Sequence, residues 1–252
     1  MLKVKSVLVS QPKPETDKSP YFDLAEMCKV KVDFRPFIHV EGVPSKEFRQ
    51  QRINLLDFDA VIFTSRNAVD HYFRAAEEAR VKIPDDMKYF CISESTAFYL
   101  QKYIVYRKRK IFFGQQTFSD LITIIKKYKE CKFLLPCSDI LRPDIPKLLD
   151  DNGIKYQPAT LYRTVCSDLS DLKDVNYDVL VFFSPSGIKS LYQNFPQFKQ
   201  NNTRIAVFGP TTAKAAEEAG LKIDIAAPQP ESPSMTKALE LYIKKVNKNG
   251  KK

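Results

Sequence analysis

The sequence predicts an α/β protein made of two domains with parallel sheets, and two observations support this. Short runs of β-branched residues alternate with amphipathic helical stretches along the chain, which is typical of βαβ units around a doubly wound parallel sheet. A strand, a Ser/Thr turn and a helix start also occur twice, 119 residues apart. The chain has 252 residues, of which 44% are hydrophobic, and this suffices for two cores of ordinary size.

Six segments are expected to form buried strands, because each is a short apolar run that polar or small residues follow. They are Val4–Val9, Asp59–Thr64, Tyr89–Ile92, Lys132–Leu135, Asp178–Phe183 and Arg204–Phe208. The expected helices are Ala68–Glu78, Ser95–Lys102, Phe118–Tyr128, Asp144–Asp151, Gly187–Phe195 and Thr211–Ala219. Gly153 and Gly220 stand where the residue that ends a helix belongs.

An internal duplication indicates how these elements are divided between the domains. Three pairs of segments match, the last more weakly: Asp59–Val69 with Asp178–Ile188, Ser93–Ala97 with Gly209–Ala213, and Val7–Pro12 with Phe133–Ser138. The third pair assigns the N-terminal strand to the C-terminal half of the chain. A repeat of only two units is no solenoid. It predicts two similar α/β domains instead.

The first domain is therefore expected to be discontinuous. It would contain residues 1–37 and 168–252, and the second domain residues 41–164. The chain would leave the first domain near Arg35–Val40 and return near Pro158–Val165. Two antiparallel crossing segments would then form a hinge.

The net charge of +10 comes almost entirely from two basic clusters. Arg107–Lys110 supplies four positive charges, and the segment after Tyr242 supplies five more without an acid. The remainder is nearly neutral. We interpret the clusters as a solvated loop and a frayed terminus, because no stacking aromatics or nucleic-acid motif accompany the tail. Nucleic-acid binding through these clusters is the alternative.

The cysteines and the N-terminus give no sign of a metal site or of export. The five cysteines fit no metal-ligand spacing and are expected to be buried free thiols: Cys28, Cys91, Cys131, Cys137 and Cys166. The first apolar run, Val7–Val9, is too short for a signal peptide. No run approaches the ~20 apolar residues that span a bilayer. We expect a cytoplasmic protein without a metal or membrane contact.

Candidate binding residues lie where the expected strands end, since ligands of open α/β sheets bind beyond the carboxyl ends of the strands. Hydroxyls and helix N-termini at these ends favour an anion. The candidates there are Ser10, Thr64, Ser65, Ser95, Thr96, Cys137, Ser138, Ser184, Ser186, Gly187, Gly209, Thr211 and Thr212. The alternative for Ser65, Ser95, Ser184 and Thr211 is that they only cap helices.

Other chemistries find little support in the sequence. The seven glycines form neither a dinucleotide fingerprint nor a phosphate loop. His39 and His71 have no serine motif near them that suggests a triad, and we interpret both as surface or satisfied core residues. An enzyme here would work without the usual nucleophile, metal or cofactor.

The chain resembles the uroporphyrinogen-III synthase family over essentially its whole length. The resembling segments, in order, are Ile62–Ser65, Leu135–Cys137, Leu161–Val165, Phe182–Gly187, Gly209–Ala213 and Glu231–Leu239. The resemblance implies two Rossmann-like α/β domains, the first discontinuous, joined by a two-stranded hinge. It implies a lyase of haem biosynthesis that needs no cofactor. The implied substrate is hydroxymethylbilane, a linear chain of four pyrroles with eight carboxylates, many of them held by main-chain N–H groups.

The implied reaction loses the hydroxyl of the first ring as water and closes the macrocycle with the fourth ring inverted, giving uroporphyrinogen III. The resemblance implies that Tyr162 assists departure of the hydroxyl, and that Thr96 and Thr212 position carboxylates. Arg204 and Arg66 would supply basic groups. The turn Ser93–Ala97 departs from the family pattern, because Ser93 stands where many relatives have a glycine, and Glu94 beside it puts a negative charge near one expected anion site.

Two further readings stay open. The chain could be a non-catalytic cytoplasmic relative that binds a tetrapyrrole or another anion, or it could bind nucleic acid through its basic clusters. We expect a monomer, because no exposed apolar stripe stands out in the sequence. Transient contact with the preceding enzyme of the pathway, which makes the unstable substrate, is also left open.

Overall fold

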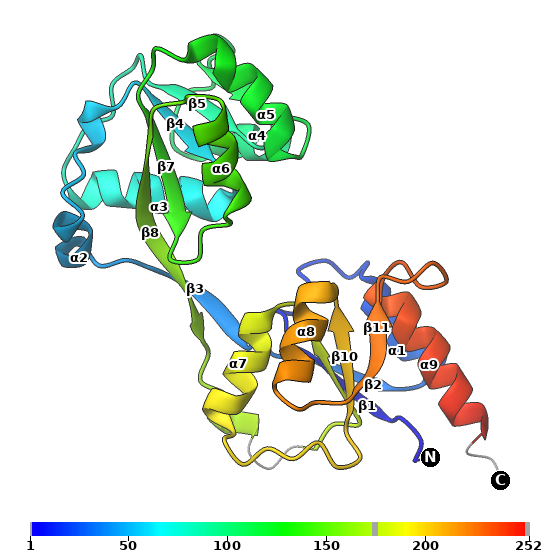
Figure 1. The fold of residues 1–252 in the computed structure, drawn as a ribbon. Coiled ribbons are helices and arrows are strands. Elements are labelled where there is room, and N and C mark those ends of the chain that lie inside the picture. Colours follow the sequence, from blue (N-terminus) through cyan, green and yellow to red (C-terminus); the bar gives the residue numbers. More distant parts are fainter. Residues whose placement is uncertain (1, 173–175, 250–252) are drawn as a thin grey trace. The chain divides into compact units, whose positions relative to one another are not determined.

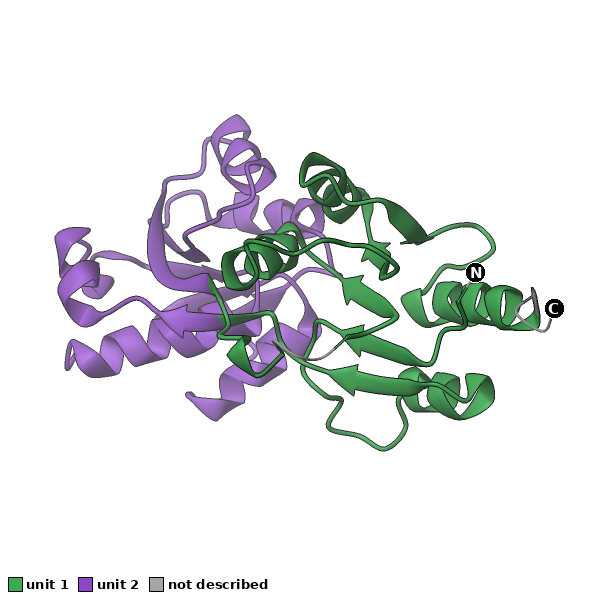
Figure 2. Ribbon diagram, turned by 90° about the horizontal axis from the view of Figure 1, so that it is seen from below, with its two compact units in different colours: residues 1–39, 165–252 green, residues 40–164 purple. Residues whose placement is uncertain are grey.

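The computed structural model describes residues 2–172 and 176–249. The chain forms two compact units, residues 1–39 with 165–252 (unit 1) and residues 40–164 (unit 2) (Figure 2). It passes between them within two strands, β3 (Ile38–Gly42) and β8 (Tyr156–Cys166) (Figure 1). That the units are domains moving about a hinge stays a prediction. In the described residues, no helix is long and apolar enough to cross a membrane.

Unit 2 contains most of a six-stranded sheet, in the order β3-β8-β7-β4-β5-β6. The four pairings from β8 to β6 are all parallel. Its other strands are β4 (Ala60–Phe63), β5 (Lys88–Cys91), β6 (Ile111–Phe113) and β7 (Phe133–Ser138). Its helices are α2 (Ser45–Gln50), α3 (Arg66–Glu78), α4 (Glu94–Tyr99), α5 (Phe118–Ile125) and α6 (Asp144–Asp151). Short 3₁₀ helices cover Leu55–Asp57, Leu100–Lys102 and Lys126–Tyr128.

Unit 1 contains a five-stranded parallel sheet in the order β11-β10-β9-β1-β2. The strands are β1 (Ser6–Val9), β2 (Lys31–Phe34), β9 (Val179–Phe182), β10 (Arg204–Phe208) and β11 (Ile223–Ala227). The helices are α1 (Pro20–Cys28), α7 (Pro185–Asn194), α8 (Pro210–Glu218) and α9 (Met235–Asn249), with a 3₁₀ turn at Ser170–Leu172. The predicted α/β class with parallel sheets is confirmed.

The duplicated segments occupy equivalent places in the two sheets. Strands β1, β9 and β10 lie side by side in unit 1, and their sequence partners β7, β4 and β5 lie side by side in the same order in unit 2. Helix α5 precedes β7 with only a short 3₁₀ helix between them, whereas the equivalent helix α9 is the last described element and β1 the first. Asn247 of α9 bridges this gap, since its side chain bonds Val4 N at 2.8 Å and Val4 O at 3.0 Å.

Both faces of each sheet are covered, because alternate strand residues point to opposite sides. In unit 1, Val7 and Val9 pack with α1 and α9, while Leu8 packs with α7 and α8. In unit 2, Val61 packs with α3 and Ile62 with α5 and α6. These are the helix arrangements of a doubly wound sheet, and they leave the carboxyl edge of each sheet to the loops.

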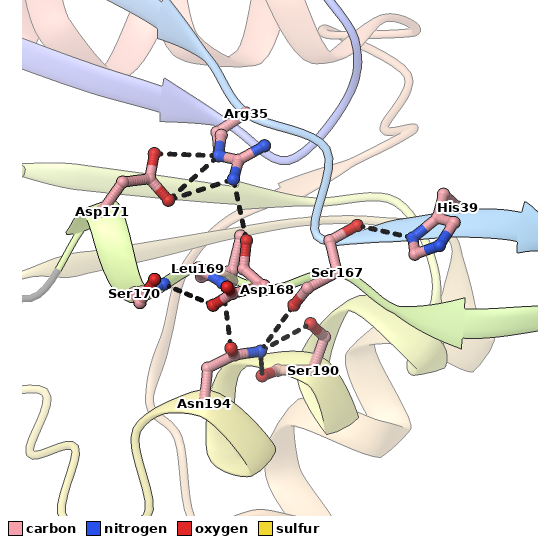
Figure 3. A network of polar contacts seen from close by, with 9 residues as sticks. All are labelled: Arg35, His39, Ser167, Asp168, Leu169, Ser170, Asp171, Ser190 and Asn194. Carbon is pink, nitrogen blue, oxygen red and sulfur yellow. Dashed lines mark hydrogen bonds and ion pairs between the residues drawn. The ribbon is translucent and has the colours of Figure 1, made fainter.

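A polar network in unit 1 holds the segments that lead into the crossing strands (Figure 3). Arg35 donates three hydrogen bonds to the Asp171 carboxylate, two of 3.0 Å and one of 3.3 Å. Asn194 of α7 donates to the Ser167 carbonyl at 2.9 Å. The Ser167 hydroxyl lies 3.1 Å from Nδ1 of His39, which is an exposed residue. Hydrogen bonds therefore join residues 35–39 and 167–171 to each other and to α7 of unit 1.

The structure corrects one sequence prediction directly. The lysine-rich segment after Tyr242 was predicted to be a frayed terminus, but Lys244, Lys245 and Lys248 belong to α9. The helix persists because Ile243 and Val246 are buried against the sheet, and Lys244 pairs with Glu240 of the preceding turn. Lys251 and Lys252 lie outside the described residues. The pattern also missed α1, α2, β2, β6 and β11.

Candidate functional site

The carboxyl edge of unit 2 gathers most of the candidates predicted there. Strands β7, β4 and β5 are neighbours and parallel, so Ser138, Thr64 and Ser93 end them at one edge. Ser65 follows in an extended conformation and accepts a hydrogen bond from Ala68 N at 3.1 Å, which makes it the N-cap of α3. The capping interpretation of Ser65 is therefore confirmed. Capping does not prevent the hydroxyl from making further contacts.

At β5 the cap lies two residues earlier than expected. Ser93, not Ser95, caps α4, since its extended backbone precedes the first helical residue and its hydroxyl accepts from Thr96 N. The capping alternative for Ser95 is therefore wrong: Ser95 is exposed in the first turn, with its Oγ 3.1 Å from the Ser93 hydroxyl. Thr96 is buried and its Oγ1 also contacts Ser93 at 3.1 Å.

Tyr162 lies at this same edge, opposite Ser138 in the pairing of β7 with β8. Its side chain is mostly buried, with 8% exposed, and its hydroxyl lies 3.4 Å from Ser65 Oγ. Burial raises the pKa of Tyr162, and the contact with Ser65 lowers it less. The phenol is therefore protonated at neutral pH. Because Ser65 already accepts Ala68 N–H, its own proton can point to the Tyr162 oxygen, which leaves the phenol proton for a ligand.

Arg66 provides a cation at the start of α3. It is exposed, and its guanidinium carbon lies 5.3 Å from the centre of the Tyr99 ring. The Tyr99 hydroxyl donates to the Asp70 carboxylate at 3.0 Å, and Lys102 donates to the same carboxylate at 3.0 Å. Asp70 thus holds the Tyr99 ring through its hydroxyl, while the Arg66 guanidinium lies over the face of the ring. The sequence did not indicate this stacking partner.

The last candidates of unit 2, Cys137 and Ser138, are already engaged. Cys137 is buried, its thiol lies 3.5 Å from the Ala159 carbonyl, and burial raises its pKa. It is a neutral thiol rather than a nucleophile. The Ser138 hydroxyl closes a local turn, donating to Ile140 O at 2.8 Å and accepting from Ile140 N at 3.2 Å.

In unit 1 the candidates Ser10, Ser184 and Gly187 come together. Ser10 follows β1 and its N–H bonds the Val181 carbonyl of β9 at 3.0 Å. Ser184 caps α7 by accepting from Gly187 N at 3.3 Å, which confirms its capping interpretation. A Cβ added to Gly187 would lie 3.8 Å from the Ser184 hydroxyl and 3.9 Å from that of Ser10. The nearest atom to such a Cβ is a ring carbon of Phe182 at 3.3 Å, so the absence of a side chain lets this turn pack closely on the strand, and Ser186 lies in the same helical turn.

The start of α8 offers main-chain donors. Gly209, and not Thr211, is the N-cap, so the capping alternative for Thr211 is wrong. Gly209 has φ 83° and ψ 154°, a conformation open almost only to glycine. It has no side chain to cap the helix and Pro210 has no N–H, so the N–H groups of Thr211 and Thr212 have no acceptor within the helix. The Thr212 hydroxyl is buried and has no hydrogen-bond partner among the described residues.

Arg204 does not lie with the other candidates. It is the first residue of β10, paired with Val179 at the start of β9, so it stands at the amino end of the sheet. A five-residue strand separates its two ends by about 13 Å. Arg204 is buried and donates to the carbonyl of Leu2 ahead of β1. This placement indicates a structural role rather than contact with a ligand at the carboxyl edge.

Two residues near Tyr162 were missed by the sequence reasoning. The His71 ring stacks on the Tyr162 ring with their centres 5.2 Å apart, and Arg74 bonds His71. Both lie on α3, six and nine residues after Ser65, and no motif marks them. Within residues 2–172 and 176–249, no three His, Cys, Asp or Glu side chains gather in a way that could hold a metal ion.

Comparison with known proteins gives a consistent result. The family model described as uroporphyrinogen-III synthase HemD matches residues 24–237. The uroporphyrinogen-III synthase of Saccharomyces cerevisiae is 32% identical over 139 residues, which cover about half of each chain (49% of this one and 50% of the yeast protein). That of Chlorobaculum parvum is 24% identical over 96% of this chain and 100% of its own.

The fold is similar to that of a solved relative. The crystal structure of uroporphyrinogen-III synthetase from Helicobacter pylori has a TM-score of 0.59 and 19% sequence identity, covering 95% of this chain and 99% of that one. At this identity the likeness concerns the fold alone. The family model, in contrast, spans most of the sequence. The chain therefore belongs to the uroporphyrinogen-III synthase family, whose members are cyclising lyases of haem biosynthesis.

Proposed function

We propose that this chain cyclises hydroxymethylbilane to uroporphyrinogen III, with inversion of ring D and loss of water, and that Tyr162 assists the loss of the hydroxyl. The observation that carries the role of Tyr162 is its position. Its phenol lies at the carboxyl edge of unit 2 beside Ser65 and is protonated at neutral pH, and its proton is available to a ligand when Ser65 is the donor of their contact.

In the first step the phenol of Tyr162 donates a hydrogen bond to the hydroxyl on the methylene of ring A. The carbon–oxygen bond breaks and water departs, which leaves an electrophilic azafulvene. Ring D attacks through its substituted carbon and forms a spiro intermediate, which breaks and re-forms with the ring inverted. The proton that ring D loses on regaining aromaticity balances the one taken up by the departing hydroxyl. Only water leaves overall.

The main demand on the protein is to hold one conformer of a flexible polyanion. Hydroxyls and helix N-termini suit eight carboxylates, because they donate hydrogen bonds without requiring a counter-charge for each. Thr211 and Thr212 supply such donors in unit 1, and the main chain at the start of α3, from Arg66 on, supplies them in unit 2. Excluding water would protect the cationic intermediate from hydrolysis.

Thr212 gives independent support to this proposal. A buried hydroxyl without a partner costs about 1–3 kcal/mol. The cost is offset when a ligand oxygen accepts the hydrogen bond, so such a group at a strand end suits a substrate carboxylate. We further propose that the protein acts in the cytoplasm as a monomer, without nucleic acid or a membrane.

The rival function is a relative that binds tetrapyrroles without converting them. A multiple-turnover experiment separates the two, with freshly generated hydroxymethylbilane in about 100-fold excess over protein. An enzyme converts the excess to isomer III at a rate proportional to protein concentration. A binder protects no more than one equivalent, while the remainder cyclises spontaneously to isomer I. The second result would refute the proposed function.

A further inference from the structure

The ring of His71, on α3, stacks on the ring of Tyr162, on β8. The two ring centres are 5.2 Å apart and the planes are inclined by 18°, which is a stacked arrangement. His71 comes from the second turn of α3, and Tyr162 from β8. The Tyr162 hydroxyl at the end of the same ring reaches Ser65, the N-cap of α3. Residues at the start of one helix therefore contact both the flat face and the oxygen of the Tyr162 phenol.

Arg74 fixes His71 relative to the strand that carries Tyr162. Its Nε donates to Nδ1 of His71 at 3.1 Å. Its Nη2 donates to the carbonyls of Leu161, the residue before Tyr162, and of Val43, each at 3.0 Å. The guanidinium thus holds the imidazole and the backbone of β8 at once, with five donors in a rigid plane.

These contacts also set the protonation state of the imidazole. A guanidinium can only donate, so Nδ1 of His71 must accept and the ring proton lies on Nε2. Burial, and next the charge of Arg74, lower the pKa of His71, while Asp70 and Glu78 on the same helix raise it. The group facing it from β8 is the protonated phenol of Tyr162. The ring is therefore neutral near pH 7 and above.

We propose that His71, held by Arg74, is a positioning residue that fixes the orientation of the Tyr162 phenol for the cyclisation reaction. The proposal rests on the proposed function of Tyr162. A tyrosine ring pivots about two side-chain bonds, and a flat neighbour on one face limits this motion. Because a displacement of ~1 Å can cost about 100-fold in rate, a fixed ring matters most in the reaction step. Substrate affinity depends on it less.

A double-mutant cycle tests the proposal. In the otherwise wild-type protein, His71→Ala is expected to lower kcat about two- to tenfold, the range of an aromatic stack, with little change in KM. In the Tyr162→Phe background the same substitution is expected to lower kcat no further, since the hydroxyl it serves is gone. His71→Phe, which keeps a flat ring, should recover most of the rate. Glu77→Ala, an exposed change on the same helix, is the matched control.

Equal losses in both backgrounds would overturn the proposal, because His71 would then act without the Tyr162 hydroxyl. A ¹³C-tyrosine NMR spectrum supplies a readout that does not need activity. The Tyr162 signal is assigned by its loss in Tyr162→Phe, and it should shift and broaden in His71→Ala but not in Glu77→Ala. An unchanged signal in His71→Ala would also refute the positioning role. A Tyr162→Phe protein with wild-type kcat would refute the role of Tyr162 itself, while the NMR result still reports whether His71 holds the ring.

Discussion

Replacing Tyr162 with phenylalanine removes one oxygen and leaves the ring in place. The oxygen lies 3.4 Å from Ser65 Oγ, near the outer limit of a hydrogen bond, so its loss should cost less than about 1 kcal/mol of folding free energy. The stack with His71 involves only the ring and is kept. The variant should therefore fold like the wild type, with a melting temperature lower by no more than about 4 °C.

The effect on the reaction should be much larger. A hydrogen bond to a group that gains charge is worth about 1.5–3 kcal/mol. Since each 1.36 kcal/mol is tenfold in rate, kcat should fall about ten- to a hundredfold. Initial rates of hydroxymethylbilane consumption measure this fall. The product mixture should also contain more isomer I, because spontaneous closure competes with a slower enzyme. Undiminished kcat in a folded Tyr162→Phe protein would refute the reasoning.

Four further changes test other parts of the site. Thr212→Val should leave stability unchanged or raise it by about 1 kcal/mol in denaturant titrations, because it removes an unpaired buried hydroxyl, while KM increases. Gly209→Ala should destabilise the protein by about 1–3 kcal/mol, since only glycine tolerates this backbone conformation. Arg204→Met should leave KM unchanged, as the contact of Arg204 is with Leu2 at the other end of the sheet. The lowered pKa of His71 means that the unfolded chain takes up its proton first as the pH falls below about 6.5, so stability should decrease there, and less so in His71→Phe.

Controls and contrary outcomes follow from the same contacts. Thr203→Val removes a hydroxyl that donates to Tyr177 O at 3.1 Å, so it should destabilise where Thr212→Val does not. Gly220→Ala, at φ 75° in a helix end, should cost less than Gly209→Ala. A rise in KM for Arg204→Met would instead indicate that Arg204 contributes to substrate binding. If the free energy of unfolding decreases with falling pH equally in His71→Phe and in the wild type, this decrease cannot be assigned to His71.

The fold could be predicted because short apolar strands alternate with helical stretches along the sequence. The contacts at the site could not be predicted in this way. Val7, Leu8 and Val9 are buried on alternating faces between two helical layers, and such runs can be recognised in the sequence. The three-residue strand β6 was missed because three residues are too few to show a period. Matching turns placed Ser65 and Thr212 at strand ends, since duplicated segments occupy equivalent strand ends.

The features that could not be predicted depend on how the chain is arranged in space after folding. Arg204 was expected at the substrate site because the resemblance implies a basic residue before this strand, but which end of the strand a residue occupies decides which edge it reaches. The cap at Ser93 instead of Ser95 depends on backbone angles rather than on residue type, because both are serines. The stack of His71 on Tyr162 joins residues 91 positions apart, and local periodicity carries no information about such a contact.

The most direct test of the central claim is the isomer composition of uroporphyrinogen formed from freshly generated hydroxymethylbilane, with and without catalytic amounts of this protein. We predict mostly isomer III in its presence and isomer I in its absence. Isomer I at the same rate in both samples would contradict the claim.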